Sequence, residues 1–93
     1  MKKHTVNLNK QSVALHYDGK SAPTVTAKGR GYIADEILSL AKENDIPIKE
    51  DTDLVHFLSK IEMGTEIPEN LYLAAAEVIA FAYHLKKKAP PER

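Results

Sequence analysis

Several residue types are scarce or missing in this sequence. It contains no cysteine and no tryptophan among its 93 residues. The absence of cysteine excludes disulfides, thiolate zinc sites, iron–sulfur clusters and cysteine nucleophiles. Basic and acidic residues balance at 13 each, and a zero formal charge argues against a polycation that coats nucleic acid. A domain this small buries only about 60% of its unfolded surface, so we expect a thin core and no deep enzyme cleft.

Long apolar runs are also missing. The basic start at residues 1–5 leads into no apolar segment, so no signal peptide is predicted. The least polar stretch, residues 71–85, includes Glu77 and His84. It is shorter than the roughly 20 apolar residues that span a bilayer. We therefore expect no membrane insertion and a cytoplasmic location.

The first third of the chain is patterned for strands. Residues 12–17 alternate in polarity, as a half-buried strand does. Turn-forming residues occupy 18–23, and residues 24–27 are again prone to form a strand. These segments predict a hairpin, and a shorter strand at residues 5–8 is compatible with the same pattern.

The rest of the chain is patterned mainly for helices. An apolar stripe begins at Tyr32, and Asn44 or Asp45 suits the left-handed conformation that ends a helix. Residues 46–49 are too short for a helix and predict a brief strand, which makes a right-handed parallel crossover the default connection. Cap residues at 51–53 predict a second helix.

The third predicted helix has the clearest signals. Pro68 suits a first-turn position, and three lysines at residues 86–88 suit the carboxyl end of the helix. The elements together predict an α/β fold, a small mixed β-sheet of about four short strands packed by about three to four helices. We expect one domain over residues 1–88 and a flexible tail over residues 89–93.

Few residues suggest chemistry. The four histidines are scattered, with no HExxH and no pair four residues apart, so no metal site is predicted. Residues Lys28–Gly31 follow a strand and open a helix, which is the topology of an anion site. Glycines needed for a sharp turn explain this segment better, because the full nucleotide-binding patterns are missing. An anion- or nucleotide-binding regulatory domain stays as the alternative, and no enzyme and no cofactor are expected.

Six short segments match one protein family in order and spacing. They are residues 13–18, 21–23, 27–29, 46–48, 62–68 and 71–80. Together they resemble the cytoplasmic domain of the FlhB/YscU family, the export-apparatus switch proteins of bacterial flagella and type III secretion systems. The resemblance implies a protein-binding role in export. The implied partners are export substrates, the switch regulator or export-gate proteins, and through them the membrane export apparatus.

The family's self-cleavage motif is degenerate in this chain. Members cleave themselves after the Asn of an Asn-Pro-Thr-His motif, whose positions map here onto Asn7, Leu8, Asn9 and Lys10. Cleavage needs the Asn amide held against its own main-chain carbonyl, and proline supplies that turn while histidine assists proton transfer. Leu8 and Lys10 supply neither, so we expect no self-cleavage.

The resemblance also implies a substrate-docking site. The family's apolar pocket maps onto Ala22 and Pro23 in the hairpin loop and onto Ala76 and Ile79 in the last helix. Small residues beside a proline would leave a shallow groove for a short apolar peptide. The alternative left open is that Ala76 and Ile79 only pack the core.

Overall fold

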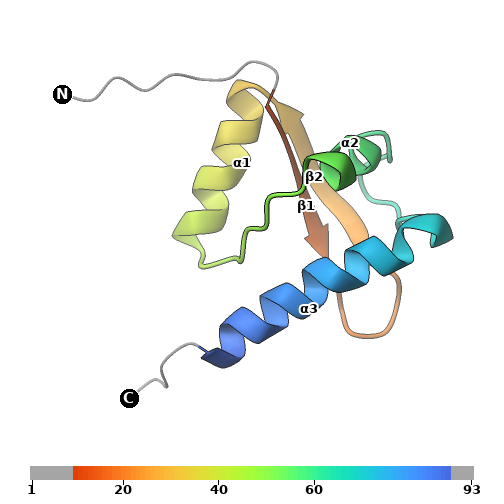
Figure 1. Cartoon of the computed structure of the whole chain (residues 1–93). Coiled ribbons are helices and arrows are strands. Elements are labelled where there is room, and N and C mark those ends of the chain that lie inside the picture. Colours follow the sequence, from red (N-terminus) through yellow and green to blue (C-terminus); the bar gives the residue numbers. More distant parts are fainter. Residues whose placement is uncertain (1–9, 89–93) are drawn as a thin grey trace.

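A hairpin followed by three helices makes up the part of the chain, residues 10–88, that the computed structural model describes. In chain order (Figure 1) the elements are β1 (Gln11–His16), β2 (Thr24–Arg30), α1 (Tyr32–Glu43), α2 (Thr52–Leu58), the 3-10 turn η1 (Glu69–Leu71) and α3 (Tyr72–Lys88). The fold is mixed α/β as expected. The expected strand at 5–8 and tail at 89–93 lie outside the described residues. No helix within the described range is long and apolar enough to cross a membrane.

The hairpin contains one β-bulge. Leu15 on β1 lies opposite Val25 on β2. Two residues earlier on β1, Val13 lies opposite Lys28, which is three residues later on β2. The additional residue is Thr26, and a bulge of this kind shifts the alternation of side chains on its strand. Val25 and Lys28 therefore lie on the same face of the sheet, the face of Val13 and Leu15.

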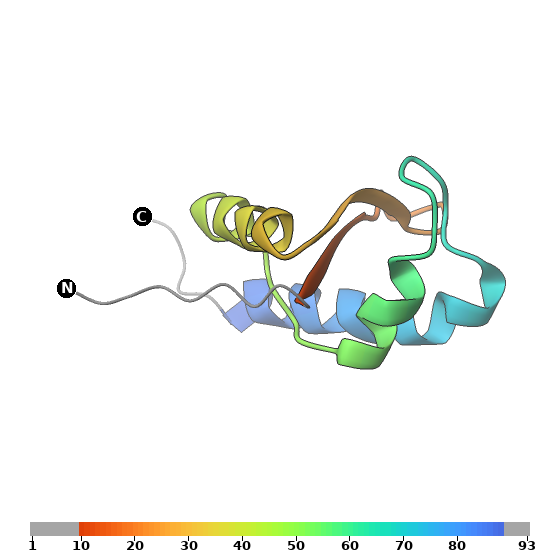
Figure 2. The ribbon, with the colours of Figure 1, turned by 90° about the horizontal axis from the view of Figure 1, so that it is seen from above.

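That face forms the core with α2 and α3. Val13 and Leu15 pack, partly buried, against a cluster of almost fully buried side chains. The cluster comprises Val25, Leu54, Leu58, Ile67 and Ala75. Burying one such aliphatic side chain contributes about 1.5–3 kcal/mol. Figure 2 shows α2 and α3 on this side of the hairpin and α1 on the other.

The opposite face carries small residues, and α1 packs closely on it. By strand alternation and register these residues are Ser12, Ala14, Ala27 and Gly29. In α1, Ala34 is fully buried. A Cβ atom added to Gly29 would overlap the Ile33 side chain. Glycine at this position is therefore what allows the helix to approach the sheet.

Both ends of α1 are set by special backbone conformations. Gly31, the residue before the helix, has φ 63° and donates its N–H to the Lys10 carbonyl at 2.8 Å. At the other end Asp45 has φ 57°, and the Ile46 N–H donates to the Ala41 carbonyl at 2.8 Å. This is a Schellman ending, so the predicted left-handed cap is confirmed at Asp45.

The connection between α1 and α2 corrects the sequence prediction. No strand forms at 46–49, and the described sheet has two antiparallel strands instead of about four, without a parallel crossover. The Ile46 N–H is used by the helix ending and Pro47 has none, so this segment has too few donors for a ladder. Instead, the Lys49 ammonium lies over the Phe81 ring, 5.3 Å from its centroid, and links the connection to α3.

Side-chain hydrogen bonds fix both ends of α2. Asp51 is the predicted cap, and its carboxylate accepts from the Leu54 N–H at 3.0 Å. At the carboxyl end, the Lys28 ammonium donates to the Ser59 carbonyl at 3.1 Å and to the Ile61 carbonyl at 2.7 Å. Lys28 thereby ties β2 to α2, which the bulge makes possible.

A short segment after α2, residues 64–67, runs along the outer edge of β2. The Gly64 N–H donates to the Val25 carbonyl at 2.7 Å, and the Val25 N–H donates to the Thr65 carbonyl at 3.0 Å. The Ile67 N–H donates to the Pro23 carbonyl at 2.9 Å. We call residues 64–67 the edge segment. It anchors the start of β2 by main-chain bonds and leads directly into η1 and α3.

Candidate functional site

The four residues expected to dock a peptide lie together in one groove. Ala22 and Pro23 come from the hairpin loop, and Ala76 and Ile79 come from α3. The groove encloses about 580 Å³ between the loop and the helix. We call it the apolar groove. Its other lining residues are Tyr17, Lys20, Ser21, Tyr72, Ala80 and Tyr83.

Helical spacing divides α3 into a core face and a groove face. Ala75 of α3 belongs to the core, and Ala74 and Val78 of α3 pack against it, as does Leu71 at the end of η1. Ala76 is exposed and Ile79 half-buried, and neither belongs to that cluster. The apolar surface of Ala76 is therefore exposed toward the groove, so Ala76 does not merely pack the core.

Three tyrosines surround the apolar groove. The exposed fractions of Tyr17, Tyr72 and Tyr83 are 45%, 46% and 67%. Sequence reasoning missed all three, although a signal was present. Tyr72, Ala76 and Tyr83 follow each other at helical spacing of i, i+4 and i+11, a second stripe beside the stripe that faces the core.

Hydrogen bonds donated by main-chain N–H groups hold the loop wall of the groove. The Asp18 carboxylate accepts from the Ser21 N–H at 2.9 Å and from the Lys20 N–H at 2.8 Å, as in an Asx turn. Both bonds lower the pKa of Asp18 below its ordinary value, and the bond from Ser21 has the larger effect. Pro23 at the end of the loop is held by Ile67. The wall is thus formed before any ligand binds, which reduces the entropy cost of binding.

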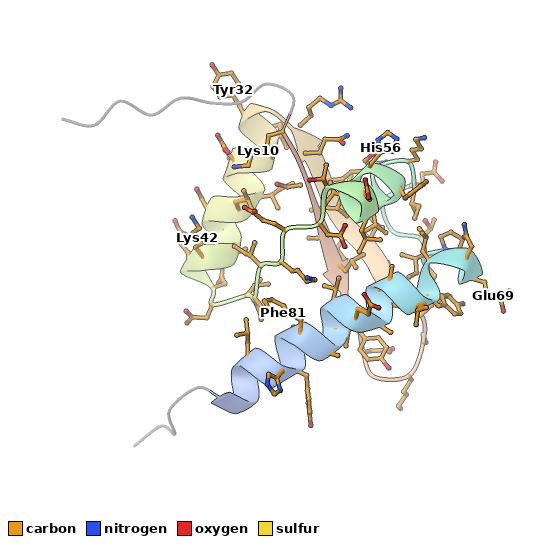
Figure 3. The ribbon with its side chains drawn as sticks, in the orientation of Figure 1. Lys10, Tyr32, Lys42, His56, Glu69 and Phe81 are labelled. Carbon is orange, nitrogen blue, oxygen red and sulfur yellow. The ribbon has the colours of Figure 1, made fainter. Side chains whose placement is uncertain are left out.

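The degenerate cleavage-motif positions fall mostly outside the described residues. Asn7, Leu8 and Asn9 lie there, and only Lys10 is described. The Lys10 ammonium forms an ion pair with the Asp35 carboxylate at 3.2 Å, and Figure 3 shows Lys10 beside α1. Lys10 is therefore a surface ion-pair partner, and the pair contributes about 0–1 kcal/mol to stability.

Hydrogen-bond donors of the segment Lys28–Gly31 are used within the fold. The Lys28 ammonium is bonded to the carbonyls after α2, and the Gly31 N–H is bonded to Lys10. Two of the three N–H groups of the Lys28 ammonium and the Gly31 N–H are already used within the fold, which weakens the alternative of a nucleotide site. Among the described residues, no cluster of His, Asp and Glu side chains could hold a metal ion.

Comparisons with known proteins match this chain to one protein family. Residues 6–82 match the model of the FlhB HrpN YscU SpaS family. The chain is 42% identical to the uncharacterized protein YlqH of Bacillus subtilis, over 82% of this chain and 84% of YlqH. It is 44% identical to the flagellar biosynthetic protein FlhB of Escherichia coli, over 82% of this chain and 21% of FlhB. The chain thus matches about a fifth of the flagellar relative's length.

Solved structures are similar as well. The cytoplasmic domain of FlhB from Shewanella putrefaciens superposes with a TM-score of 0.79 at 30% identity, covering 92% of this chain and 78% of that one. The mutated R313T EscU/SpaS C-terminal domain superposes with a TM-score of 0.75 at 32% identity, covering 80% of this chain and 95% of that one. The fold is therefore shared with these two domains.

Proposed function

Because the chain belongs to the FlhB HrpN YscU SpaS family, we propose that it is a non-enzymatic protein-interaction module of flagellar or type III protein export. It acts in the cytoplasm and binds export substrates, the switch regulator or export-gate proteins. Its association with the membrane export apparatus runs through those partners. The observation that carries this proposal is the apolar groove, which joins Ala22, Pro23, Ala76 and Ile79.

The chemistry of the apolar groove fits a short apolar peptide. Ala76 and Ala80 are exposed and lie one helical turn apart, so the surface between them is low enough to receive a bulky side chain. Tyrosines offer a large contact area with few rotatable bonds. A peptide segment with one or two large apolar residues would bury these side chains and the alanine surface together.

The test is to place a charge in the groove without disturbing the core. Ala76 is exposed, so Ala76→Glu puts a carboxylate among the apolar lining residues at little cost in folding. We expect at least about a tenfold loss of affinity, roughly 1.4 kcal/mol, for a labelled apolar peptide from a flagellar export substrate, measured by fluorescence anisotropy.

Leu73→Glu is the matched control. Leu73 is 76% exposed on the same helix and does not line the groove. The control introduces the same side chain and should leave both peptide affinity and thermal midpoint nearly unchanged. Equal affinities for Ala76→Glu and the wild type would rule out the apolar groove as the peptide site.

We also propose that the chain does not cleave itself. The support is the replacement of the Pro and His positions of the motif by Leu8 and Lys10. Self-cleavage needs a turn that holds the Asn amide at attack distance from its own carbonyl, and the sequence lacks the proline that would set that turn after Asn7. Intact-mass measurement after days at neutral pH should give the uncleaved mass, and a fragment beginning at Leu8 would contradict the proposal.

A further inference from the structure

A second groove lies at the other end of the hairpin. It encloses about 490 Å³ between the start of β1, the end of β2 and the carboxyl end of α2. We call it the basic groove. Its lining residues are Gln11, Lys28, Gly29, Arg30, His56, Ser59 and Lys60. No carboxylate lines it, whereas the chain as a whole has equal numbers of acidic and basic residues.

The charged ends of Arg30 and Lys60 are available to a ligand. Both residues are exposed, as is His56. Within residues 10–88, no hydrogen bond or ion pair holds the Arg30 guanidinium or the Lys60 ammonium. Lys28 differs, because its ammonium is bonded to the carbonyls of Ser59 and Ile61. Two cations from different elements therefore flank one concavity without a counter-charge.

The surroundings of the basic groove favour several separate carboxylates over one compact dianion such as phosphate. A phosphate site is normally built from main-chain N–H groups at a helix amino end. Here the groove lies at the carboxyl end of α2, where the carbonyl groups repel concentrated negative charge. Carboxylates spaced along an extended segment can reach Arg30 and Lys60 separately and keep away from those carbonyls.

We propose that the basic groove binds an acidic segment of a partner polypeptide, with Arg30 and Lys60 pairing to its carboxylates and Gln11 bonding to its main chain. The fork of the Arg30 guanidinium suits a bidentate bond to one carboxylate. Because the apolar groove lies at the opposite end of the hairpin, this site does not depend on the function proposed above. The two grooves would contact different partners or different parts of one partner.

The probe is a fluorescein-labelled peptide of alternating Glu and Ser, titrated with the full chain and followed by fluorescence anisotropy. The wild type should bind it, and affinity should fall as NaCl is raised, because added salt screens exposed charges. Arg30→Glu with Lys60→Glu should weaken binding by at least about tenfold. Far-UV circular dichroism and thermal melting should show that this double variant is folded.

The matched control reverses two lysines elsewhere. Lys42→Glu with Lys49→Glu changes the total charge equally and leaves the basic groove intact, since neither residue lines it or the apolar groove. Figure 3 shows Lys42 on α1, well away from His56 on α2. This control should retain wild-type affinity.

Four results would overturn the proposal. Equal losses in the two double variants would mean that total charge alone attracts the peptide. Displacement by inorganic phosphate well beyond that by NaCl of the same ionic strength would assign the groove to phosphate. Absence of wild-type binding at low salt would leave the basic groove without this ligand. Finally, binding could be lost in Ala76→Glu and retained in Arg30→Glu with Lys60→Glu. That result would place the acidic peptide in the apolar groove instead.

Discussion

The two faces of the β1–β2 hairpin are packed by different means. On the face toward α2 and α3, large aliphatic side chains such as Val25 and Leu58 exclude water. On the face toward α1, small residues let the helix approach so closely that Ile33 fills the space that a Cβ atom at Gly29 would need. The first face should therefore be sensitive to the removal of atoms, and the second to their addition.

Removal of atoms from the core face should have the largest effect. Leu58 is 3% exposed, so Leu58→Ala leaves a cavity and should lower the free energy of unfolding by about 2–5 kcal/mol. Urea denaturation followed by circular dichroism measures this change. Phe57→Ala is the control, because Phe57 is 53% exposed and its truncation should cost about 0.5 kcal/mol or less. Similar losses in both variants would contradict the assignment of the core.

Addition of atoms to the α1 face should come next. Gly29→Ala forces a methyl group against Ile33 and should cost about 1–3 kcal/mol in the free energy of unfolding. In an Ile33→Ala background the same substitution should cost much less, because the clashing side chain is gone. The double-mutant cycle measures this coupling. Additive losses would show that α1 does not depend on close approach at Gly29.

Loss of the α2 cap should have a smaller effect, confined to the core face. Asp51→Ala removes the acceptor for the Leu54 N–H and should cost about 1 kcal/mol. Asp51→Asn keeps an acceptor oxygen and should cost less. Hydrogen exchange by NMR should show faster exchange in α2 than in α1 for the alanine variant. Equal acceleration in both helices would break the distinction between the two faces.

The smallest effect concerns the loop that joins the two strands and belongs to neither face. The pKa of Asp18 is lowered in the folded chain by the Ser21 N–H first and then by the Lys20 N–H. A lowered pKa means that this contribution to stability is present above about pH 4 and is lost as pH falls through the folded value.

Asp18→Asn separates this effect from the rest of acid unfolding. The wild type should lose slightly more thermal stability than Asp18→Asn between neutral pH and pH values below the folded pKa, as measured by thermal melting. The asparagine keeps an acceptor for the loop N–H groups but does not titrate, so Asp18→Asn is the control for the wild type. Identical pH profiles for the two proteins would show that the Asp18 hydrogen bonds do not stabilise the loop.

Local signals predicted most of the fold. The hairpin, the start of α1 at Tyr32, the cap of α2 at Asp51 and the left-handed ending at Asp45 depend on residues near in sequence. The strand at 46–49 was wrong, because whether an extended segment becomes a strand depends on a partner far along the chain. Here the neighbouring edge of β2 is occupied by the edge segment.

The candidate site was less accessible to sequence reasoning. Ala22, Pro23, Ala76 and Ile79 came from the family resemblance, since small apolar residues carry no chemical signature of their own. Their convergence in one groove depends on the position of α3, which long-range packing sets. The sequence points to the turn at Lys28–Gly31 but not to the basic groove, because Lys60 joins Arg30 only in three dimensions.

The edge segment has a consequence for solubility during protein production. A free strand edge invites another chain to add to the sheet, which is a common start of aggregation. In this chain Gly64, Thr65 and Ile67 already occupy the hydrogen-bonding groups of Pro23 and Val25. Since these bonds use main-chain atoms, the side chains of exposed neighbours such as Met63 can change during evolution while the start of β2 stays covered.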